Sequence, residues 1–176
     1  MPSPAPTVAG TTTWRRIPSP VGPLLVAATQ DALVAIEFRD NRHPVRRIGI
    51  WREGDSPLLQ AAGRQLGEYF AGTRRVFDLP LAPRGTPFQQ SVWAALARIP
   101  HGATWGYAEL ARQVGKPTAV RAVGAANGRN PLPIVLPCHR VLGSDGALTG
   151  FGGGLATKAF LLRLEGALAG GGDLFA

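Results

Sequence analysis

The segment TPFQQSVWAALARI, residues 86–99, carries the clearest helix signal in the chain. Thr86 is suited to cap a helix, Pro87 suits its first position, and Gln89 can complete a capping box with Thr86. Apolar side chains then recur at helical spacing: Phe88, Val92, Leu96 and Ile99. The segment therefore predicts a helix with one apolar face, and it marks the start of a helical second half.

Two shorter helices are expected after it, over residues 107–114 and 118–126, with Gly115 ending the first. Two short helices joined by a tight, glycine-containing turn are typical of a helix-turn-helix, although any helical hairpin shows the same pattern. The second of these helices carries one long polar side chain, Arg121, among small neighbours. Such a face either packs closely against another helix or lets the backbone approach DNA.

The first half has shorter apolar runs separated by turn residues, as in a small sheet. Residues 24–28 and 32–38 flank a short polar turn and predict a β-hairpin, and residues 76–81 predict one more strand. Residues 39–55 are polar and are expected to be irregular. A helix is expected to end at Gly72, because apolar residues recur every four positions before it: Leu58, Ala62, Leu66 and Phe70.

Together these patterns predict an α+β fold in two parts. A small N-terminal domain, residues 14–81, combines a short antiparallel sheet with a helix, and residues 82–85 form a linker. Residues 86–176 form a mainly helical domain that contains the helix-turn-helix. Residues 1–13 lack the basic start and apolar core of a signal peptide, so we expect a flexible leader and a cytoplasmic protein.

The chain is strongly basic, with 19 Lys and Arg against 11 Asp and Glu and a net charge of +8. This charge suits a polyanionic partner such as nucleic acid, although a basic surface can also serve solubility alone. Position favours nucleic acid, because six basic residues and one acid, Glu109, lie between Arg98 and Arg140. No apolar run reaches the roughly 18–20 residues of a membrane helix, so no membrane partner is expected.

Cys138 is the only cysteine, which excludes an internal disulfide and a Cys-rich zinc site. The three histidines are scattered, so neither a metal nor another cofactor is expected. A lone cysteine is usually a small buried hydrophobe. Here residues 134–136 are expected to form a strand that ends just before Cys138, and His139-Arg140 follow the cysteine in sequence. A nearby cation and imidazole lower the pKa of a thiol, so we expect Cys138 to be a reactive nucleophile.

The neighbourhood of Cys138 also resembles a known family. Pro137-Cys138-His139-Arg140 resembles the active-site signature of the methylated-DNA–protein-cysteine methyltransferases, also called O6-alkylguanine-DNA alkyltransferases. The resemblance runs without gaps through residues 86–166 and is looser over Ser19–Leu24. Its further motifs are Thr86-Pro87-Phe88-Gln89, Val92-Trp93, Ile99-Pro100, Tyr107, Arg121-Ala122-Val123-Gly124, Asn130-Pro131, Gly152-Gly153-Gly154-Leu155, Lys158 and Leu161-Leu162.

This resemblance implies a DNA repair protein that flips O6-alkylguanine out of duplex DNA, chiefly O6-methylguanine, with O4-methylthymine as a further candidate. The alkyl group would pass irreversibly to Cys138, once per molecule and without a cofactor. His139 would act as its base through a bridging water, oriented by Glu165. Asn130 would tie the chain to this network, and Tyr107 would help the base rotate and donate to guanine N3.

The family also implies a DNA-binding face and a substrate pocket. The helix-turn-helix would lie in the minor groove of double-stranded DNA, with Arg121 entering the space that the flipped nucleotide leaves. The DNA-binding residues would be Arg121, Ala119, Val120, Ala122, Gly124, Arg129 and Arg140. The pocket residues would be Phe151, Gly152, Gly153, Lys158, Val141 and Pro133. A monomer is expected; cooperative assembly on DNA suits a small basic protein, but no residue establishes it.

Two positions depart from the family's pattern. Gly106 stands where a serine usually precedes the tyrosine, which matters little because glycine is also a fair N-cap. Phe151 replaces a usual tyrosine, and loss of the hydroxyl is expected to slow transfer or alter the preference among alkyl groups.

Three alternative functions would require different features from those seen in this sequence. Lesion-binding relatives that transfer nothing lack the cysteine that this chain has. A helix-turn-helix transcription factor would leave His139 and Glu165 unexplained. A cysteine hydrolase would need an oxyanion hole and repeated turnover.

Overall fold

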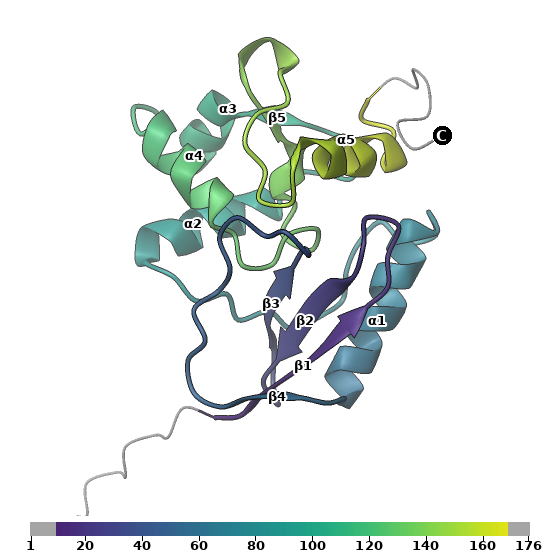
Figure 1. Ribbon diagram of the computed structural model, residues 1–176. Helices are drawn as coiled ribbons and strands as arrows, with labels where there is room; N and C mark the ends of the chain where they lie inside the picture. Colours follow the sequence, from purple (N-terminus) through teal and green to yellow (C-terminus); the bar gives the residue numbers. More distant parts are fainter. Residues whose placement is uncertain (1–9, 169–176) are drawn as a thin grey trace, which may run out of the picture.

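The computed structural model describes residues 10–168, which form a sheet-containing N-terminal half and a helical C-terminal half packed against it (Figure 1). This is the α+β fold that the sequence predicts. No helix among these residues is both long and apolar enough to cross a membrane. The elements in chain order are β1 (Thr12–Ile17), β2 (Leu24–Ala28), β3 (Leu33–Glu37), β4 (Trp51–Glu53), α1 (Pro57–Phe70), α2 (Pro87–Leu96), β5 (Trp105–Gly106), α3 (Tyr107–Gln113), α4 (Val120–Gly128), a 3-10 turn (Cys138–Arg140), β6 (Val141–Leu142), a second 3-10 turn (Ser144–Gly146) and α5 (Leu155–Leu164).

The N-terminal strands form one sheet in the order β3-β2-β1-β4. β1, β2 and β3 pair in antiparallel fashion, whereas β4 lies parallel to β1 at the edge. The predicted hairpin is confirmed as β2 and β3. α1 packs beside the sheet (Figure 1) and buries Leu59, Ala62 and Leu66. The hairpin and the helix of this half thus follow from two apolar runs and one apolar helix stripe.

Two strands of the sheet, β1 and β4, were not predicted from the sequence. β1 begins at Thr12, which is buried, so Thr12 and Thr13 do not belong to the flexible leader expected over residues 1–13; residues 1–9 lie outside the described part of the chain. β4 falls inside the segment expected to be irregular. β4 has only three residues, which is too few for an alternating pattern to indicate a strand.

Residues 76–81 do not form the expected strand, and only an isolated bridge joins Leu81 to Leu33. The backbone of Asp78 instead pairs with the Gln65 side chain, whose Nε2 donates to the Asp78 carbonyl at 2.9 Å and whose Oε1 accepts from its amide at 2.8 Å. Pro80 has no amide hydrogen to give to a sheet. A side chain of α1 therefore takes the place of a neighbouring strand.

The capping box at Thr86 is confirmed. The Thr86 hydroxyl accepts from the Gln89 amide at 3.1 Å, and Gln89 Oε1 accepts from the Thr86 amide at 3.0 Å. α3 and α4 form the expected helical pair, with Gly115 in the left-handed region at φ +72° between them. The Trp93 indole of α2 donates to the Ala126 carbonyl of α4 at 2.8 Å, which fixes this pair against the first helix of the half.

The two halves share one apolar core that includes Leu24, Ile36, Trp93, Leu132 and Leu161. The Ile36 amide of β3 donates to the Pro131 carbonyl at 2.9 Å, so the sheet edge is bonded directly to the segment that precedes Cys138. Figure 1 shows α1 and the sheet below the helical half, with α5 above α1. The N-terminal half is consequently placed to support the surroundings of Cys138.

Candidate active site

Cys138 is presented by a loop rather than by the strand expected over residues 134–136. Ile134 has φ +75°, which ends any extended run, and the Leu136 amide turns back to donate to the Leu132 carbonyl at 2.8 Å. Asn130 holds this loop from both sides: its Nδ2 donates to the Leu136 carbonyl at 2.7 Å and its Oδ1 accepts from the Leu132 amide at 3.0 Å. This geometry supports the tethering role expected of Asn130.

His139 is completely buried and is oriented by Glu165. Its Nε2 lies 2.8 Å from Glu165 Oε1. Burial lowers the pKa of His139 against the opposing effect of Glu165, so the ring is neutral near pH 7. Because Glu165 is an acceptor, the neutral ring carries its proton on Nε2 and leaves Nδ1 with a lone pair. Nδ1 is buried and has no hydrogen-bond partner among residues 10–168, so it is free to accept a proton.

Arg140 does not lie on the DNA-binding face, so the prediction for this residue is wrong. It is buried, and its Nε and Nη2 donate to Glu165 at 2.9 and 2.8 Å. Its Nη1 donates to the Ile99 carbonyl at 2.6 Å. The 3-10 turn separates successive side chains by about 120°, so neighbours of Cys138 in sequence point to different sides. Arg140 is therefore a counter-ion of Glu165.

A residue of the N-terminal half completes this network. The Tyr69 hydroxyl of α1 donates to Glu165 Oε1 at 2.9 Å, and burial raises the pKa of Tyr69 well above its usual range. We call Tyr69, His139, Arg140 and Glu165 the Glu165 cluster. Burial alone would raise the pKa of Glu165, but hydrogen bonds from His139 and Arg140 hold it far below its ordinary value. Glu165 is thus an anion at neutral pH. No signal in the sequence points to Tyr69 as its partner.

The thiol of Cys138 is not acidified as the sequence suggested. Burial raises the pKa of Cys138 to about 11, while the hydrogen bond with Asn130 and the charge of Lys158 lower it only partly. Arg140, which was expected to lower it, is committed to Glu165 instead. At neutral pH the resting group is therefore a thiol, and it must lose its proton to a base in order to react.

Lys158 is buried behind the loop that precedes the glycine run. Its Nζ donates to the carbonyls of Val141 at 2.6 Å and Thr149 at 2.9 Å. Burial lowers the pKa of Lys158 to about 8. The Tyr107 hydroxyl also donates to the Thr149 carbonyl, at 3.3 Å. Lys158 and Val141, expected in the pocket, therefore support this loop from behind and do not line the space in front of Cys138.

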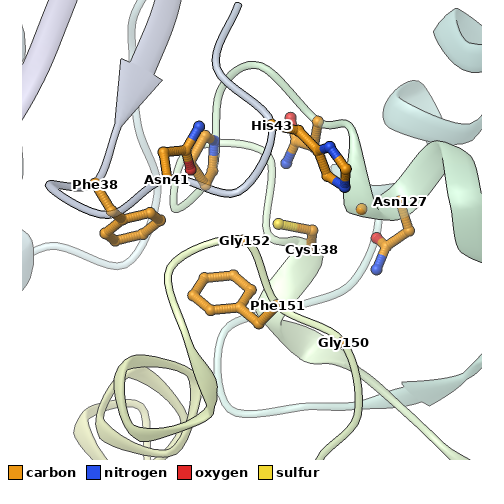
Figure 2. Close-up of a pocket in the computed structure, with 11 residues that line it drawn as sticks. Phe38, Asn41, His43, Asn127, Cys138, Gly150, Phe151 and Gly152 are labelled. Carbon is orange, nitrogen blue, oxygen red and sulfur yellow. The ribbon is translucent and has the colours of Figure 1, made fainter.

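The Cys138 sulfur is directed into a small cavity of about 20 Å³ between the two halves (Figure 2). We call this space the Cys138 cavity; it is lined by Phe38, Asn41, His43, Asn127, Gly128, Asn130, Pro133, Cys138, Gly150, Phe151 and Gly152. Pro133, Phe151 and Gly152 were expected there. This volume holds about one water molecule, so a nucleobase can enter only after the wall opens.

The wall that must open joins the glycine run to the N-terminal half. The Phe38 and Phe151 rings meet edge to face, with centroids 5.4 Å apart. Gly153 lies so close to Phe38 that an added Cβ would come within 2.6 Å of its ring. The Arg42 amide donates to the Gly152 carbonyl at 3.1 Å. Phe38, Asn41 and His43 were not expected at this site, because nothing in the sequence brings residues 38–43 next to residue 151.

The outer face of α4 leads to the mouth of the cavity. Val120, Arg121, Ala122 and Arg129 are exposed, while Ala119 and Gly124 are half-buried. Gly124 is close to Tyr107, whose ring would lie 3.6 Å from an added Cβ. A second hollow of about 240 Å³ adjoins the first and shares with it His43, Gly128 and the stretch 150–152. Arg121 thus projects from a helix whose far end lines the Cys138 cavity.

Comparison with known proteins agrees with this arrangement. Residues 87–167 match the DNA-binding domain of 6-O-methylguanine DNA methyltransferase, and residues 13–83 match its ribonuclease-like domain. The chain is 50% identical over 149 residues to a methylated-DNA–protein-cysteine methyltransferase of Methanosarcina barkeri, which covers 85% of this chain and 94% of the relative. It is 47% identical over 153 residues to the constitutive enzyme of Bacillus subtilis, covering 84% and 91%.

Solved structures show the same similarity. The structure of Mycobacterium tuberculosis OGT in complex with DNA superposes with a TM-score of 0.81 and 45% identity, over 88% of this chain and 93% of that one. The two matched domains account for most of the chain and meet at the Cys138 cavity. This chain therefore belongs to the 6-O-methylguanine DNA methyltransferase family.

Proposed function

We propose that this protein repairs DNA by removing the alkyl group from O6-alkylguanine, chiefly O6-methylguanine, and transferring it irreversibly to Cys138. One observation carries the proposal: the only cysteine lines a cavity at the end of an exposed helix, beside a buried neutral imidazole with one free nitrogen. The basic chain, the exposed Arg121 and the DNA-bound relative support DNA as the partner. The DNA of the cytoplasm is the expected place of action.

In the transfer step, a water between the thiol and His139 Nδ1 passes the Cys138 proton to the imidazole. The thiolate then attacks the alkyl carbon of the lesion. A sulfur–carbon bond forms, the carbon–O6 bond breaks, and the electron pair of that bond stays on guanine. Guanine takes up one proton at N1, so the net reaction converts a thiol and an O6-alkylguanine into a thioether and guanine. The thioether is stable, so each molecule reacts once.

The Glu165 cluster supplies the conditions for this step. Glu165 is an anion that fixes the His139 ring through Nε2, and it stabilises the imidazolium that forms when Nδ1 takes the proton. Arg140 and Tyr69 hold Glu165 in place. The base therefore stays neutral before the reaction and becomes a paired cation during it.

Entry of the base requires DNA distortion as well as opening of the cavity. We place α4 in the minor groove, where its small residues allow close approach and Arg121 fills the gap left by the flipped nucleotide. Arg129, Ala119, Val120, Ala122 and Gly124 surround that point. Tyr107 lies between α4 and the loop at Thr149, a position suited to guide the base and to donate to guanine N3.

Intact-protein mass spectrometry tests the proposal. The protein is incubated with a duplex oligonucleotide that contains one O6-methylguanine, beside the Cys138→Ser variant. We expect a gain of one methyl group, about 14 Da from its formula, limited to one per molecule and absent from the variant. A protein that binds the lesion duplex without any change in mass would be a lesion sensor, and the proposal would be wrong.

A further inference from the structure

Glu37 is a buried carboxylate that the proposed transfer mechanism does not use. It is the last residue of β3 and is only 5% exposed, and its neighbour Ile36 belongs to the apolar core. A buried carboxylate weakens a fold unless it is paired and hydrogen-bonded, and an apolar side chain would avoid that cost. The partners of Glu37 therefore indicate what this carboxylate does.

Three hydrogen bonds reach the Glu37 carboxylate from the chain that follows β3. The Val45 amide donates to Oε2 at 2.6 Å. The Arg47 guanidinium donates from Nη1 to Oε2 at 3.0 Å and from Nη2 to Oε1 at 2.7 Å. The Arg47 Cζ also lies 4.4 Å from the centroid of the Trp51 ring in β4. Because a two-pronged pair between arginine and a carboxylate fixes direction as well as position, Arg47 is held between β3 and β4.

These contacts close residues 38–45 into a loop whose two ends meet at one side chain. Residues 38–50 form no helix or strand, so no ladder of backbone hydrogen bonds holds them. The chain leaves the sheet after Glu37, and the Val45 amide returns to the Glu37 carboxylate. Compact loops of this kind, with adjacent ends, are held by side chains. We call this segment the 38–45 loop; the Glu37 carboxylate ties it to the sheet in place of strand pairing.

The middle of the 38–45 loop forms one side of the Cys138 cavity. Three of its side chains line the cavity from the N-terminal half (Figure 2): Phe38, Asn41 and His43. The Phe38 ring also meets the Phe151 ring on the opposite side. Because the loop has no regular structure of its own, the place of this side of the cavity depends on the tie at Glu37.

We propose that Glu37 and Arg47 are positioning residues for alkyl transfer, because they hold the 38–45 loop as the fixed side of the cavity wall. This fixed side limits the size of the alkyl group that Cys138 can accept. The alkyl group of a bound lesion must lie between the sulfur and the wall of a cavity that now holds about one water molecule. A methyl group fits once the glycine run has moved, whereas a benzyl group also needs the fixed side to yield. This inference rests on the proposed alkyl transfer.

The first measurement needs no DNA. Cys138 is the only cysteine, so the rate at which the protein reacts with an aromatic disulfide reports the accessibility of this one sulfur. Glu37→Gln keeps the size of the side chain and removes its charge, and we expect the thiol to react about tenfold faster, since the loop leaves the cavity more often. Arg47→Met leaves the Val45 amide bonded to Glu37, so a smaller increase is expected.

The second measurement compares two alkyl groups in otherwise identical duplexes. Single-turnover transfer is followed from O6-benzylguanine and from O6-methylguanine, and the ratio of the two rates is compared between the wild type and Glu37→Gln. We expect this benzyl-to-methyl ratio to rise about fivefold in the variant, through faster benzyl transfer, because a side of the cavity that can yield discriminates less by size.

Two controls separate the tie from general effects on the sheet. Asp55→Asn removes a carboxylate that forms an exposed ion pair with Arg15 in the same half, and it should change neither readout. Val26→Ala removes buried volume from β2 without touching the 38–45 loop. This variant should melt at a lower temperature than the wild type and yet keep its thiol reactivity and its rate ratio.

A Glu37→Gln variant with the thiol reactivity of the wild type would overturn the inference, as would an unchanged benzyl-to-methyl ratio. The same increases in Val26→Ala would also overturn it, because they would follow from lost stability alone. Failure of the proposed function has a separate signature, since no alkyl group would then appear on wild-type Cys138. The thiol reactivity without DNA does not depend on transfer, so the two failures are distinguishable.

Discussion

The Glu165 cluster and the Cys138 cavity are neighbours in space but opposite in character. In the cluster, one carboxylate accepts hydrogen bonds from three buried side chains of two distant segments. The cavity instead has a buried thiol and a glycine-containing wall that is held by one ring contact and one backbone hydrogen bond. The fold thus holds the neutral His139 ring and its anionic partner Glu165 rigidly in place in advance, while it leaves the substrate side incomplete until a nucleobase enters.

Removing the charge of the cluster should have the largest effect. Glu165→Gln leaves Arg140 buried without its counter-ion, which costs about 3–5 kcal/mol of stability. The substitution also removes the carboxylate that stabilises the protonated His139 ring, and we expect transfer to slow by about a hundredfold or more. Urea unfolding and single-turnover transfer measure the two effects. The matched control is Glu109→Gln, which breaks a surface ion pair with Arg112 and should change neither.

The same anion should govern stability in acid. Because the pKa of Glu165 is held below its ordinary 4.5, the unfolded chain takes up this proton first as the pH falls. The stabilisation is fully present above pH 4.5 and is lost as the pH falls through the lower pKa of the folded state. We expect the free energy of unfolding to drop steeply below pH 4.5, and less steeply in Glu165→Gln. If the free energy of unfolding falls equally steeply with pH in the wild type and in Glu165→Gln, the folded state does not hold Glu165 as an anion.

A change on the DNA-binding face should separate DNA distortion from chemistry. Arg121 is exposed, so Arg121→Ala should leave the melting temperature unchanged. Transfer from a methylated duplex is expected to slow by about tenfold, because the flipped state loses the side chain that replaces the base. Transfer from a free O6-alkylguanine base needs no flipping and should keep its wild-type rate. An equal loss with both substrates would place Arg121 in the chemical step.

The link between the halves should have a smaller effect on transfer. Tyr69→Phe removes one hydrogen bond to a buried anion, and we expect a loss of about 1.5–3 kcal/mol in stability. Transfer should slow only a few fold, since Glu165 keeps His139 and Arg140. Thermal unfolding and single-turnover rates on the same samples test this. Unchanged stability would show that α1 does not support the cluster.

Phe151 should give the smallest effect. The ring is buried against Phe38, at a position where the resemblance to the family implies a tyrosine. We expect Phe151→Tyr to change the relative rates for methyl and larger alkyl groups by about twofold to fivefold, the range of one weak hydrogen bond. Competition between duplexes with different alkyl groups measures this ratio. If every alkyl substrate keeps its rate, the hydroxyl lost at this position has no role in transfer.

Local signals predicted much of the fold. The capping box at Thr86, the hairpin and the helical pair around Gly115 each depend on a few adjacent residues, and each was found. β4 was missed because three residues cannot display a period, and the strand over 76–81 was wrong because Gln65 satisfies that backbone. These errors arise where a distant side chain or a very short pairing decides the structure.

The candidate site shows the same division. The resemblance to the family led to His139, Glu165 and Asn130, whose geometry now supports their expected roles. Arg140 was misplaced, because sequence adjacency does not reveal that a 3-10 turn directs it to Glu165. Tyr69 lies far from Cys138 in sequence, and no pattern marks it. Contacts between residues that are distant in sequence can be identified only in the folded structure.

The proposed mechanism requires that Cys138 rests as a thiol and is activated by His139, not by a lowered pKa of its own. Because Cys138 is the only cysteine, the difference in ultraviolet absorbance between the wild type and Cys138→Ser, measured against pH without DNA, reports its thiolate alone. We predict an apparent pKa near 11 in a protein that nevertheless transfers the methyl group at neutral pH. A thiolate already formed at pH 7 would show that Cys138 does not need His139 to remove its proton.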